Sequence, residues 1–543
     1  MTMRIYTGRA QCGKTRRLME DIAAGAAQGR RQILLAPEML SHETERRLLE
    51  TCGNSASRWA EALTFKRAAQ RILEQAGLGD QPLLDDGGRA LAMHRAVLRA
   101  EKSLTYYRTA GARPEMAERL TALIDELKSC RVTPERLMQA APAAGQAAGK
   151  IQDLALLYAA YVQITAGLAM DDKDVLAVAE QALEQSDFGK DCDIYFDGYA
   201  GFTAQERALA EKLLGRCRSM TFAVLYQQGD SLFFEQEKFI HRLKQMAERQ
   251  GVRCQIEALP PLPEQRPPAL AAVERGLFDY AAPPWQGSPA GVSLCRLDNP
   301  EEECEYAASL CRQALAAGLR CRQIALAAGD MSAYQPLLEN AFEKFQVPLF
   351  LAEKSDILQK PVLAAVNGAL QAAVQNMSYD SVFGYLKSGL SPLEDDEVDR
   401  LENYVLTWNI RGGAYFKPFE KNPAGYDGSR AAWGQEELPR LETIRQKLIP
   451  PLEDLQSRLK GCKEGGGFAR ALAGFLQQIE LESRIESKIQ DLETADRRRE
   501  AAEYAQLYEI LENALAQFAA AMEGEPMDDG EFLRLWRLTL SQY

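Results

Sequence analysis

The sharpest chemical pattern in the sequence lies near its N-terminus. Eight consecutive residues match G-x-x-x-x-G-K-[ST], in which glycines let the backbone turn tightly and aim N–H groups at phosphate oxygens. The lysine of such a loop reaches the β- and γ-phosphates, and the hydroxyl after it ligates Mg²⁺. We therefore predict a site for ATP with Mg²⁺, the alternative being a glycine-rich turn without a ligand. The eight residues are Gly8, Arg9, Ala10, Gln11, Cys12, Gly13, Lys14 and Thr15.

A magnesium site of this kind also needs a carboxylate at the end of a second strand. Asp197 follows the apolar run Ile194-Tyr195-Phe196 and would hold the metal through water. Active helicases usually continue with Glu, which activates the attacking water, but the next residue here is Gly198. The pattern therefore favours ATP binding and argues against fast hydrolysis. An ordinary Asp-Gly turn at a strand end is the alternative interpretation of Asp197.

Alternating strands and helices must position these residues. Residues 3–7 predict a strand entering the loop, and a helix follows from Lys14 to about Ala24. Residues 32–36 are a continuous apolar run, typical of a buried parallel strand, and Ser41 is a plausible N-cap for the next helix. This order predicts an α/β fold with a parallel sheet. Further strands are predicted at 63–65, 193–196 and 220–226, and a helix at 66–76.

Apolar spacing near 3.6 residues predicts long helical stretches elsewhere. Helices are predicted at 89–102, 115–130, 150–166 and 173–185, and again from about 362 to the end. A second α/β pattern has strands at 292–297, 324–327 and 348–351, with helices at 301–317 and 334–345. The last helix, at 531–543, has no C-cap, and we expect the natural protein to continue beyond it.

A proline-rich stretch separates the two α/β patterns and is typical of a stiff connector. It defines the predicted domain organisation, in which the first domain is discontinuous. The parts are a first α/β domain at 1–82 and 190–259, a helical insert at 83–189, the proline-rich linker at 260–290, the start of a second α/β domain at 291–361, and a helical insert at 362–543.

The net charge of −13 over 543 residues excludes a chain coated with basic residues, but the charge is unevenly spread. Residues 1–110 carry 18 Lys and Arg against 12 Asp and Glu, a balance of +6 that leaves −19 for the remainder. A surface for a polyanion and a set of helix faces balanced by neighbouring acids both fit this asymmetry. The basic residues come in pairs: Arg16-Arg17, Arg30-Arg31, Arg46-Arg47 and Lys66-Arg67.

An aromatic residue beside one of these pairs could stack on a nucleic-acid base. We therefore take four adjacent residues as candidates for DNA contact: Thr64, Phe65, Lys66 and Arg67.

Two other classes of protein are excluded. No uninterrupted apolar run reaches about 18 residues, which excludes a transmembrane helix, and the N-terminus lacks the apolar stretch of a secretory signal. The eleven cysteines include no Cys-x-x-Cys pair. We predict no zinc site, and reduced, mostly buried thiols in a cytoplasmic protein.

The order of segments resembles AddB, one of the two subunits of the ATP-dependent helicase–deoxyribonucleases of the AddAB type in Firmicutes-like bacteria. The resemblance covers nearly the whole chain, and only the phosphate loop in it is generic. The segments that carry it are RIYTGRAQCGKT at 4–15, LLAPEMLSHETERRL at 34–48, LTFKRAAQRIL at 63–73, IYFDGYAGFTAQE at 194–206 and LENYVLTWNIRG at 401–412.

This resemblance implies a superfamily 1 helicase-like fold, with two P-loop motor-type parallel-sheet domains and large all-helical inserts. It also implies a cytoplasmic heterodimer with the helicase–nuclease partner AddA and no membrane partner. Such a complex processes double-stranded DNA ends for recombinational repair. AddB is usually a degenerate helicase that keeps its nucleotide site, which agrees with Gly198, and it is implicated in scanning a single strand for a Chi-type sequence.

Members of the AddB family are roughly twice as long as this chain, and their C-terminal half carries a nuclease domain and an iron–sulfur cluster. None of the eleven cysteines maps onto the cluster ligands, so we expect this chain neither to hold the cluster nor to cut DNA. Two interpretations from other classes stay open. One is a stand-alone P-loop ATPase or phosphotransferase, and the other is a non-catalytic scaffold with a vestigial nucleotide site.

Overall fold

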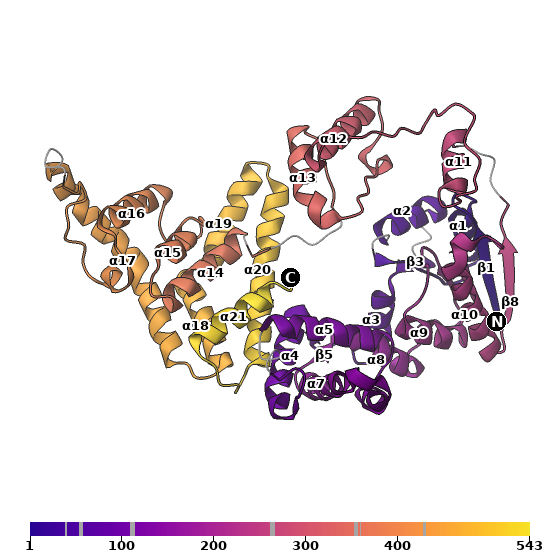
Figure 1. Cartoon of the computed structure of the whole chain (residues 1–543), viewed down its shortest axis with the longest axis horizontal. Coiled ribbons are helices and arrows are strands. Elements are labelled where there is room, and N and C mark those ends of the chain that lie inside the picture. Colours follow the sequence, from indigo (N-terminus) through magenta and orange to yellow (C-terminus); the bar gives the residue numbers. More distant parts are fainter. Residues whose placement is uncertain are drawn as a thin grey trace. The chain divides into compact units, whose positions relative to one another are not determined.

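A computed structural model describes residues 1–38, 41–53, 58–108, 114–260, 266–351, 357–358, 360–426 and 431–543 (Figure 1). The chain divides into two compact units. We call Met1–Thr64, Gly189–Gly201 and Leu213–Lys354 the α/β unit. We call Phe65–Phe188, Phe202–Lys212 and Ser355–Tyr543 the helical unit.

A six-stranded sheet, parallel throughout, forms the centre of the α/β unit. Its strand order, β3-β2-β6-β7-β1-β8, puts one strand between the strand that enters the loop and the strand that ends before Asp197. The bounds are β1 Thr2–Gly8, β2 Gln32–Leu35, β3 Ala60–Leu63, β6 Asp193–Phe196, β7 Ser219–Leu225 and β8 Arg253–Ala258.

Burial explains why most of these strands are recognisable in the sequence. All four residues of β2 and of β6 are buried, as expected for strands covered on both faces. Helix α1 (Lys14–Ala27) packs Leu18, Met19 and Ile22 into the same apolar cluster as Leu34. Strand β8 was not predicted. It lies at the edge of the sheet and is mostly exposed, so its residues form no apolar run.

The prediction of a second sheet at 291–361 is wrong for the part of that range that the structure describes. Helices α12 (Pro300–Ala316) and α13 (Met331–Lys344) form as predicted. The segments 292–297, 324–327 and 348–351 stay irregular and pair with no strand. Leu294 and Phe350 are almost fully exposed. An apolar run becomes a strand only where a neighbour satisfies its backbone hydrogen bonds, and here none does.

The proline-rich stretch also differs from a simple connector. It contains helix α11 (Pro268–Gly276), which begins with a proline in its first turn, where the missing N–H costs nothing. Two more helices complete the α/β unit, α2 (Ser41–Cys52) and α10 (Phe234–Arg249). Helix α9 (Ala204–Leu214) belongs to both units.

The helical unit holds one large apolar core to which both predicted helical segments contribute, from Ala90 to Leu540. A two-strand parallel ladder joins β4 (Leu83–Leu84) to β5 (Met170–Asp171). The helices are α3 Phe65–Gln75, α4 Asp86–Ala100, α5 Pro114–Ser129, α6 Pro134–Ala140, α7 Ala148–Ala166, α8 Val175–Ala182, α14 Pro361–Val374, α15 Tyr379–Leu386, α16 Asp395–Trp408, α17 Ala431–Gly461, α18 Gly465–Gln478, α19 Leu481–Thr494, α20 Arg498–Ala521 and α21 Asp529–Leu540.

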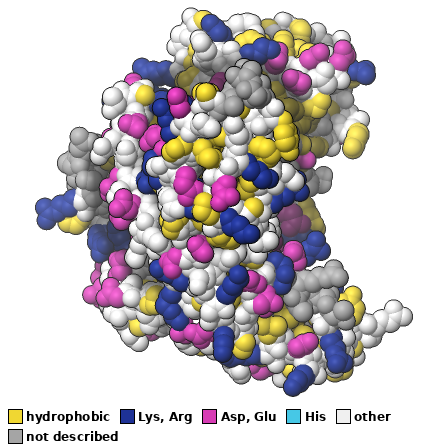
Figure 2. Space-filling model, turned by 90° about the vertical axis from the view of Figure 1, so that its left-hand side faces the viewer, with side chains coloured by type: hydrophobic (Ala, Val, Ile, Leu, Met, Phe, Trp, Pro, Cys, Tyr) yellow, Lys and Arg dark blue, Asp and Glu magenta, His cyan; other side chains and the backbone are white. Residues whose placement is uncertain are grey.

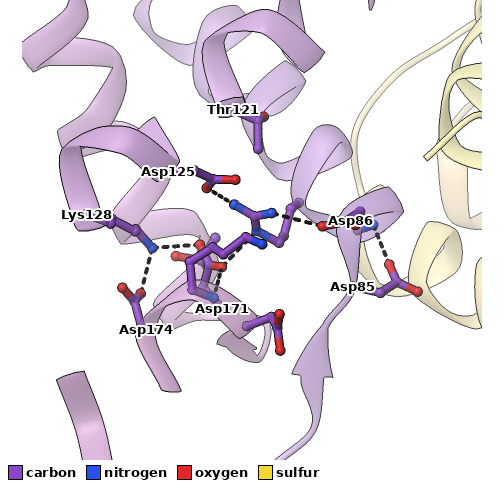
Figure 3. A network of polar contacts seen from close by, with 12 residues as sticks. Asp85, Asp86, Thr121, Asp125, Lys128, Asp171 and Asp174 are labelled. Atoms are coloured by element: carbon purple, nitrogen blue, oxygen red, sulfur yellow. Dashed lines mark hydrogen bonds and ion pairs between the residues drawn. The ribbon is translucent and has the colours of Figure 1, made fainter. Parts of the chain in front are cut away.

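Buried charges also hold this unit together (Figure 3). The carboxylate of Asp171 accepts from Arg89 Nε at 2.8 Å and from Lys128 Nζ at 2.6 Å. The hydroxyl of Tyr161 donates to it at 2.6 Å. Arg89 also pairs with Asp125. Every charge at the centre of this network therefore has an oppositely charged partner, the condition under which buried ions are tolerated.

Candidate nucleotide site

The glycine-rich loop joins β1 to α1, so the strand and helix expected on either side of it are both present. Gly13, directly before the helix, has a φ of 85°, a left-handed conformation that glycine adopts without strain. A Cβ on Gly8 would lie 2.3 Å from Cys12 Sγ. The backbone conformation thus favours glycine at position 13, and a larger residue at position 8 would have to displace the Cys12 side chain.

Lys14 lies across its own loop. Its ammonium donates to the carbonyl oxygens of Gly8 at 2.9 Å and Arg9 at 2.7 Å. These bonds hold a positive charge beside the N-terminus of α1, whose first turn contains no acidic residue. The unpaired N–H groups and dipole of a helix N-terminus attract anions. This geometry is consistent with the predicted phosphate loop, and nucleotide binding stays a prediction.

Asp197 lies at the end of β6, two strands from β1, and reaches the loop from there. Its carboxylate accepts the Gly198 N–H at 3.0 Å, and the Thr15 hydroxyl lies near enough to lower its pKa. Carboxyl ends of parallel strands share one edge of a sheet, which is why residues 182 positions apart meet. The two residues predicted to serve Mg²⁺ thus lie near each other at this edge of the sheet.

Burial raises the pKa of Asp197 above its usual value. Hydrogen bonds from Thr15 and Gly198 and the positive charges of Lys14 and Arg47 oppose this rise. The groups that touch the carboxylate directly are neutral donors, so its negative charge is not consumed by an ion pair. Such an oxygen can serve a hard cation, and Mg²⁺ usually takes one or two carboxylates and completes its shell with phosphates and water.

No group of three or more His, Cys, Asp or Glu side chains suited to a metal occurs in the residues that the structure covers. Thr15 and Asp197 alone would therefore not hold Mg²⁺ strongly, and the phosphates of a nucleotide would supply the remaining ligands. The residue after Asp197 is Gly198, with a φ of 80°, so the backbone here favours glycine over the Glu of an active helicase.

Sequence reasoning did not place Arg47 at this site, and it included Arg9 only as a position of the loop pattern, without its partners. Arg47, on α2, shares with Thr15 the wall of a 480 Å³ cleft, and its charge acts on Asp197. Arg9 pairs with Asp230 at 2.6 Å and with Glu274 at 3.0 Å. A cavity of 690 Å³ opens beside Arg9, lined by Gly8 to Cys12 and by Glu274. The only sequence signals were a basic pair and a non-glycine position inside the loop pattern.

The four candidates for DNA contact are divided by burial. Thr64 and Phe65 are buried, and the Phe65 ring packs edge-on against Phe202 at 5.4 Å between centroids. Lys66 and Arg67 are exposed at the start of α3, and Lys66 pairs with Asp172 at 2.7 Å. The DNA contact stays a prediction, with the two basic residues as its accessible members.

Acidic neighbours balance the basic pairs of the first 110 residues. Arg16 and Arg17 pair with Glu20 and Asp21 on the same helix face. Arg46 and Arg47 both pair with Glu43. Figure 2 faces the side on which α16 and α17 are drawn in Figure 1, and there too Lys and Arg side chains are interspersed with Asp and Glu. Of the two interpretations of the charge asymmetry, these contacts favour balanced helix faces.

Comparisons with known proteins agree with this geometry. A family model described as "ADDB, N-terminal" matches residues 5–274, which include the loop, Asp197 and α11. The chain belongs to the AddB family. Among curated relatives, a protein of Moorella thermoacetica is 30% identical over 561 residues, and one of Clostridium kluyveri is 26% identical over 567 residues. Both carry the name of the B-type subunit of an ATP-dependent helicase/deoxyribonuclease.

These alignments cover 98% and 100% of this AddB-family chain but 48% and 49% of the two relatives. A third relative, from Desulforamulus reducens, carries the same name and is 29% identical. That alignment covers 98% of this chain and 48% of the relative. The chain thus spans about half the length of the curated relatives it matches. In the described residues, no helix is long and apolar enough to cross a membrane.

Proposed function

We propose that this AddB-family chain is the ATP-binding, helicase-like part of a heterodimeric ATP-dependent helicase/deoxyribonuclease. The observation that carries the proposal is the position of Asp197 at the end of β6, where the Thr15 hydroxyl and the ammonium of Lys14 both lie near enough to lower the pKa of its carboxylate. In P-loop nucleotide sites these three groups bind Mg²⁺ and the β- and γ-phosphates. The names of the relatives support a role within such a complex.

ATP serves here mainly as a ligand, and its hydrolysis is slow. A general base must lie within hydrogen-bond reach of the attacking water, directly or through one more water. Gly198 provides no side chain where a base is expected, and the proposal assigns Asp197 to Mg²⁺ rather than to the attacking water. Binding and slow turnover together describe a motor-degenerate member of the complex.

The complex acts on DNA. By resemblance, its substrates are double-stranded ends resected for recombinational repair, its partner is the helicase–nuclease AddA, and a single strand is scanned for a Chi-type sequence. In this proposal the nuclease and its iron–sulfur cluster belong to sequence outside these 543 residues, and the cofactors of this chain are ATP and Mg²⁺.

A nucleotide-binding assay on the 543-residue chain tests the proposal. Lys14→Ala removes the ammonium from the loop, and we expect ATP affinity in the presence of Mg²⁺ to fall about 100-fold, since a charge-assisted contact with phosphate is lost. The control is Lys238→Ala, because Lys238 is exposed on α10 and pairs with its helix neighbour Glu235. Its affinity should equal that of the unsubstituted chain.

Three outcomes separate the candidate functions. Mg²⁺-dependent ATP binding with negligible turnover supports the degenerate motor. Rapid steady-state turnover that Lys14→Ala abolishes would support a stand-alone ATPase or phosphotransferase instead. Failure of ATP to bind, or equal affinities in both variants, would leave a scaffold with a vestigial site and contradict the proposal.

A further inference from the structure

Arg9 makes contacts that a phosphate loop does not require. Its guanidinium donates to Glu274 Oε1 at 3.0 Å, to the Glu274 backbone carbonyl at 3.0 Å and to Asp230 Oδ2 at 2.6 Å. The same group lies over the Phe233 ring, 5.3 Å from its centroid. Only 18% of the Arg9 side chain is exposed. One loop residue is therefore held by two carboxylates and one aromatic ring.

The Glu274 contact links the loop to helix α11. Two alanines, Ala269 and Ala271, are the buried residues of this nine-residue helix. An alanine side chain contributes little hydrophobic stabilisation because its single methyl group buries little area. Leu270 and Val273 are 39% exposed. The polar contacts with Arg9 are thus a substantial part of what holds α11 in place.

The backbone of Arg9 serves the nucleotide site at the same time. Its carbonyl oxygen accepts Lys14 Nζ at 2.7 Å, so one residue touches the phosphate-binding ammonium and α11. The 690 Å³ cavity lies at this junction and is lined by both Arg9 and Glu274. An anion arriving at the loop therefore enters the field of Arg9, Asp230 and Glu274 together.

We propose that Arg9 couples nucleotide occupancy of the loop to release of helix α11. This inference rests on the proposed nucleotide site and names its regulation. The phosphates of ATP compete with Glu274 and Asp230 for the Arg9 guanidinium and repel both carboxylates, which lie within a Debye length of the loop. Nucleotide binding loosens α11, and by thermodynamic reciprocity a docked α11 weakens nucleotide binding by the same factor.

Glu274→Gln is the decisive substitution, because it keeps the shape and backbone contact of Glu274 and removes its charge. We expect Mg·ATP to bind about threefold to tenfold more tightly, an effect of one unit charge at partly screened distance. The gain should shrink in high salt. The matched control is Glu248→Gln on α10, an exposed carboxylate outside the cavity lining. Its affinity should stay within about twofold of the unsubstituted chain, since exposed charges contribute little.

Hydrogen exchange of α11 provides the second readout. In the unsubstituted chain, a non-hydrolysable ATP analogue with Mg²⁺ should speed exchange of residues 268–276. In Arg9→Gln, exchange should be fast already and insensitive to the analogue, which a merely structural role of Arg9 in the loop would not produce.

The coupling is overturned if the analogue binds but leaves α11 exchange unchanged or slower. It is also overturned if Glu274→Gln and Glu248→Gln have equal affinities. Either result would leave the nucleotide site itself intact. If the analogue does not bind the unsubstituted chain at all, the proposed function fails, and the coupling fails with it.

Discussion

The carboxylates of Asp171 and Asp197 both lie at strand ends, but they differ in the groups that form hydrogen bonds or ion pairs with them. Asp171, at the end of β5 in the helical unit, contacts Arg89, Lys128 and the Tyr161 hydroxyl (Figure 3). Asp197, after β6 in the α/β unit, accepts the Gly198 N–H and lies near the Thr15 hydroxyl. The first carboxylate is saturated by internal cations, and the second has neutral donors.

The pKa directions of the two groups follow from this difference. Burial alone would raise the pKa of Asp171, but the charges of Lys128 and Arg89 and the hydrogen bonds it accepts hold the pKa below its usual value. Burial raises the pKa of Asp197, and its neighbours only reduce the rise. A saturated charge stabilises the fold, whereas an unsaturated one costs stability and is available to a ligand.

Removing the Asp171 charge should have the largest effect on stability. Asp171→Asn leaves Arg89 and Lys128 buried with too few negative partners, and we expect a loss of about 3–5 kcal/mol in the free energy of unfolding of the helical unit. Denaturant unfolding, followed by hydrogen exchange of α4 and α7, measures it. Because the Asp171 pKa is lowered, its contribution is present above about pH 4 and disappears as the pH falls through the lowered value.

Asp172→Asn is the matched control, one residue along the chain. Its partner Lys66 is 51% exposed, and exposed ion pairs contribute about 0–1 kcal/mol. A loss of the same size in both variants would contradict the distinction between saturated and exposed charge in this region.

The opposite sign is expected for the carboxylate beside the loop. Asp197→Asn removes a charge whose raised pKa marks it as costly to the fold near neutral pH, so the melting temperature of the α/β unit should rise by about 1–3 °C. The affinity for Mg·ATP should fall about 10–100-fold, as for other groups that hold a metal through a second shell. Calorimetry with and without Mg·ATP measures both. A lower melting temperature together with unchanged affinity would make Asp197 a structural turn residue.

The sequence placed Thr15 and Asp197 after two strands of one parallel sheet, which is why both were expected at the same edge of it. It also indicated most strands of that sheet, because burial on both faces leaves apolar runs such as β2 and β6. The exposed edge strand β8 leaves no such run, and the segments at 292–297, 324–327 and 348–351 showed strand-like runs without a strand to pair with.

Contacts between distant charged residues were beyond prediction for a different reason. Glu274 lies 265 residues from Arg9, and Asp171 lies 82 residues from Arg89. No local sequence pattern marks either pair. The packing of helices and strands decides which charged residues meet, and the sequence alone does not distinguish one acidic residue from another as a partner. Periodicity and turn residues carry information about neighbours along the chain. They therefore identify the loop but not Glu274, which contacts it from a distant part of the sequence.

The smallest effect is expected from Arg47, which acts on Asp197 by charge across the 480 Å³ cleft. Removing that charge in Arg47→Gln raises the pKa of Asp197 further, so the fall of Mg·ATP affinity on acidification should begin at a higher pH. The expected loss is about threefold at most as the pH falls toward the raised pKa of Asp197, and there is none well above it, because Arg47 is 52% exposed and partly screened. Arg46→Gln is the control, since Arg46 pairs with Glu43 and Glu50 and is not among the groups that shift Asp197. If both variants have the same pH profile, the Asp197 charge is set by its hydrogen bonds alone.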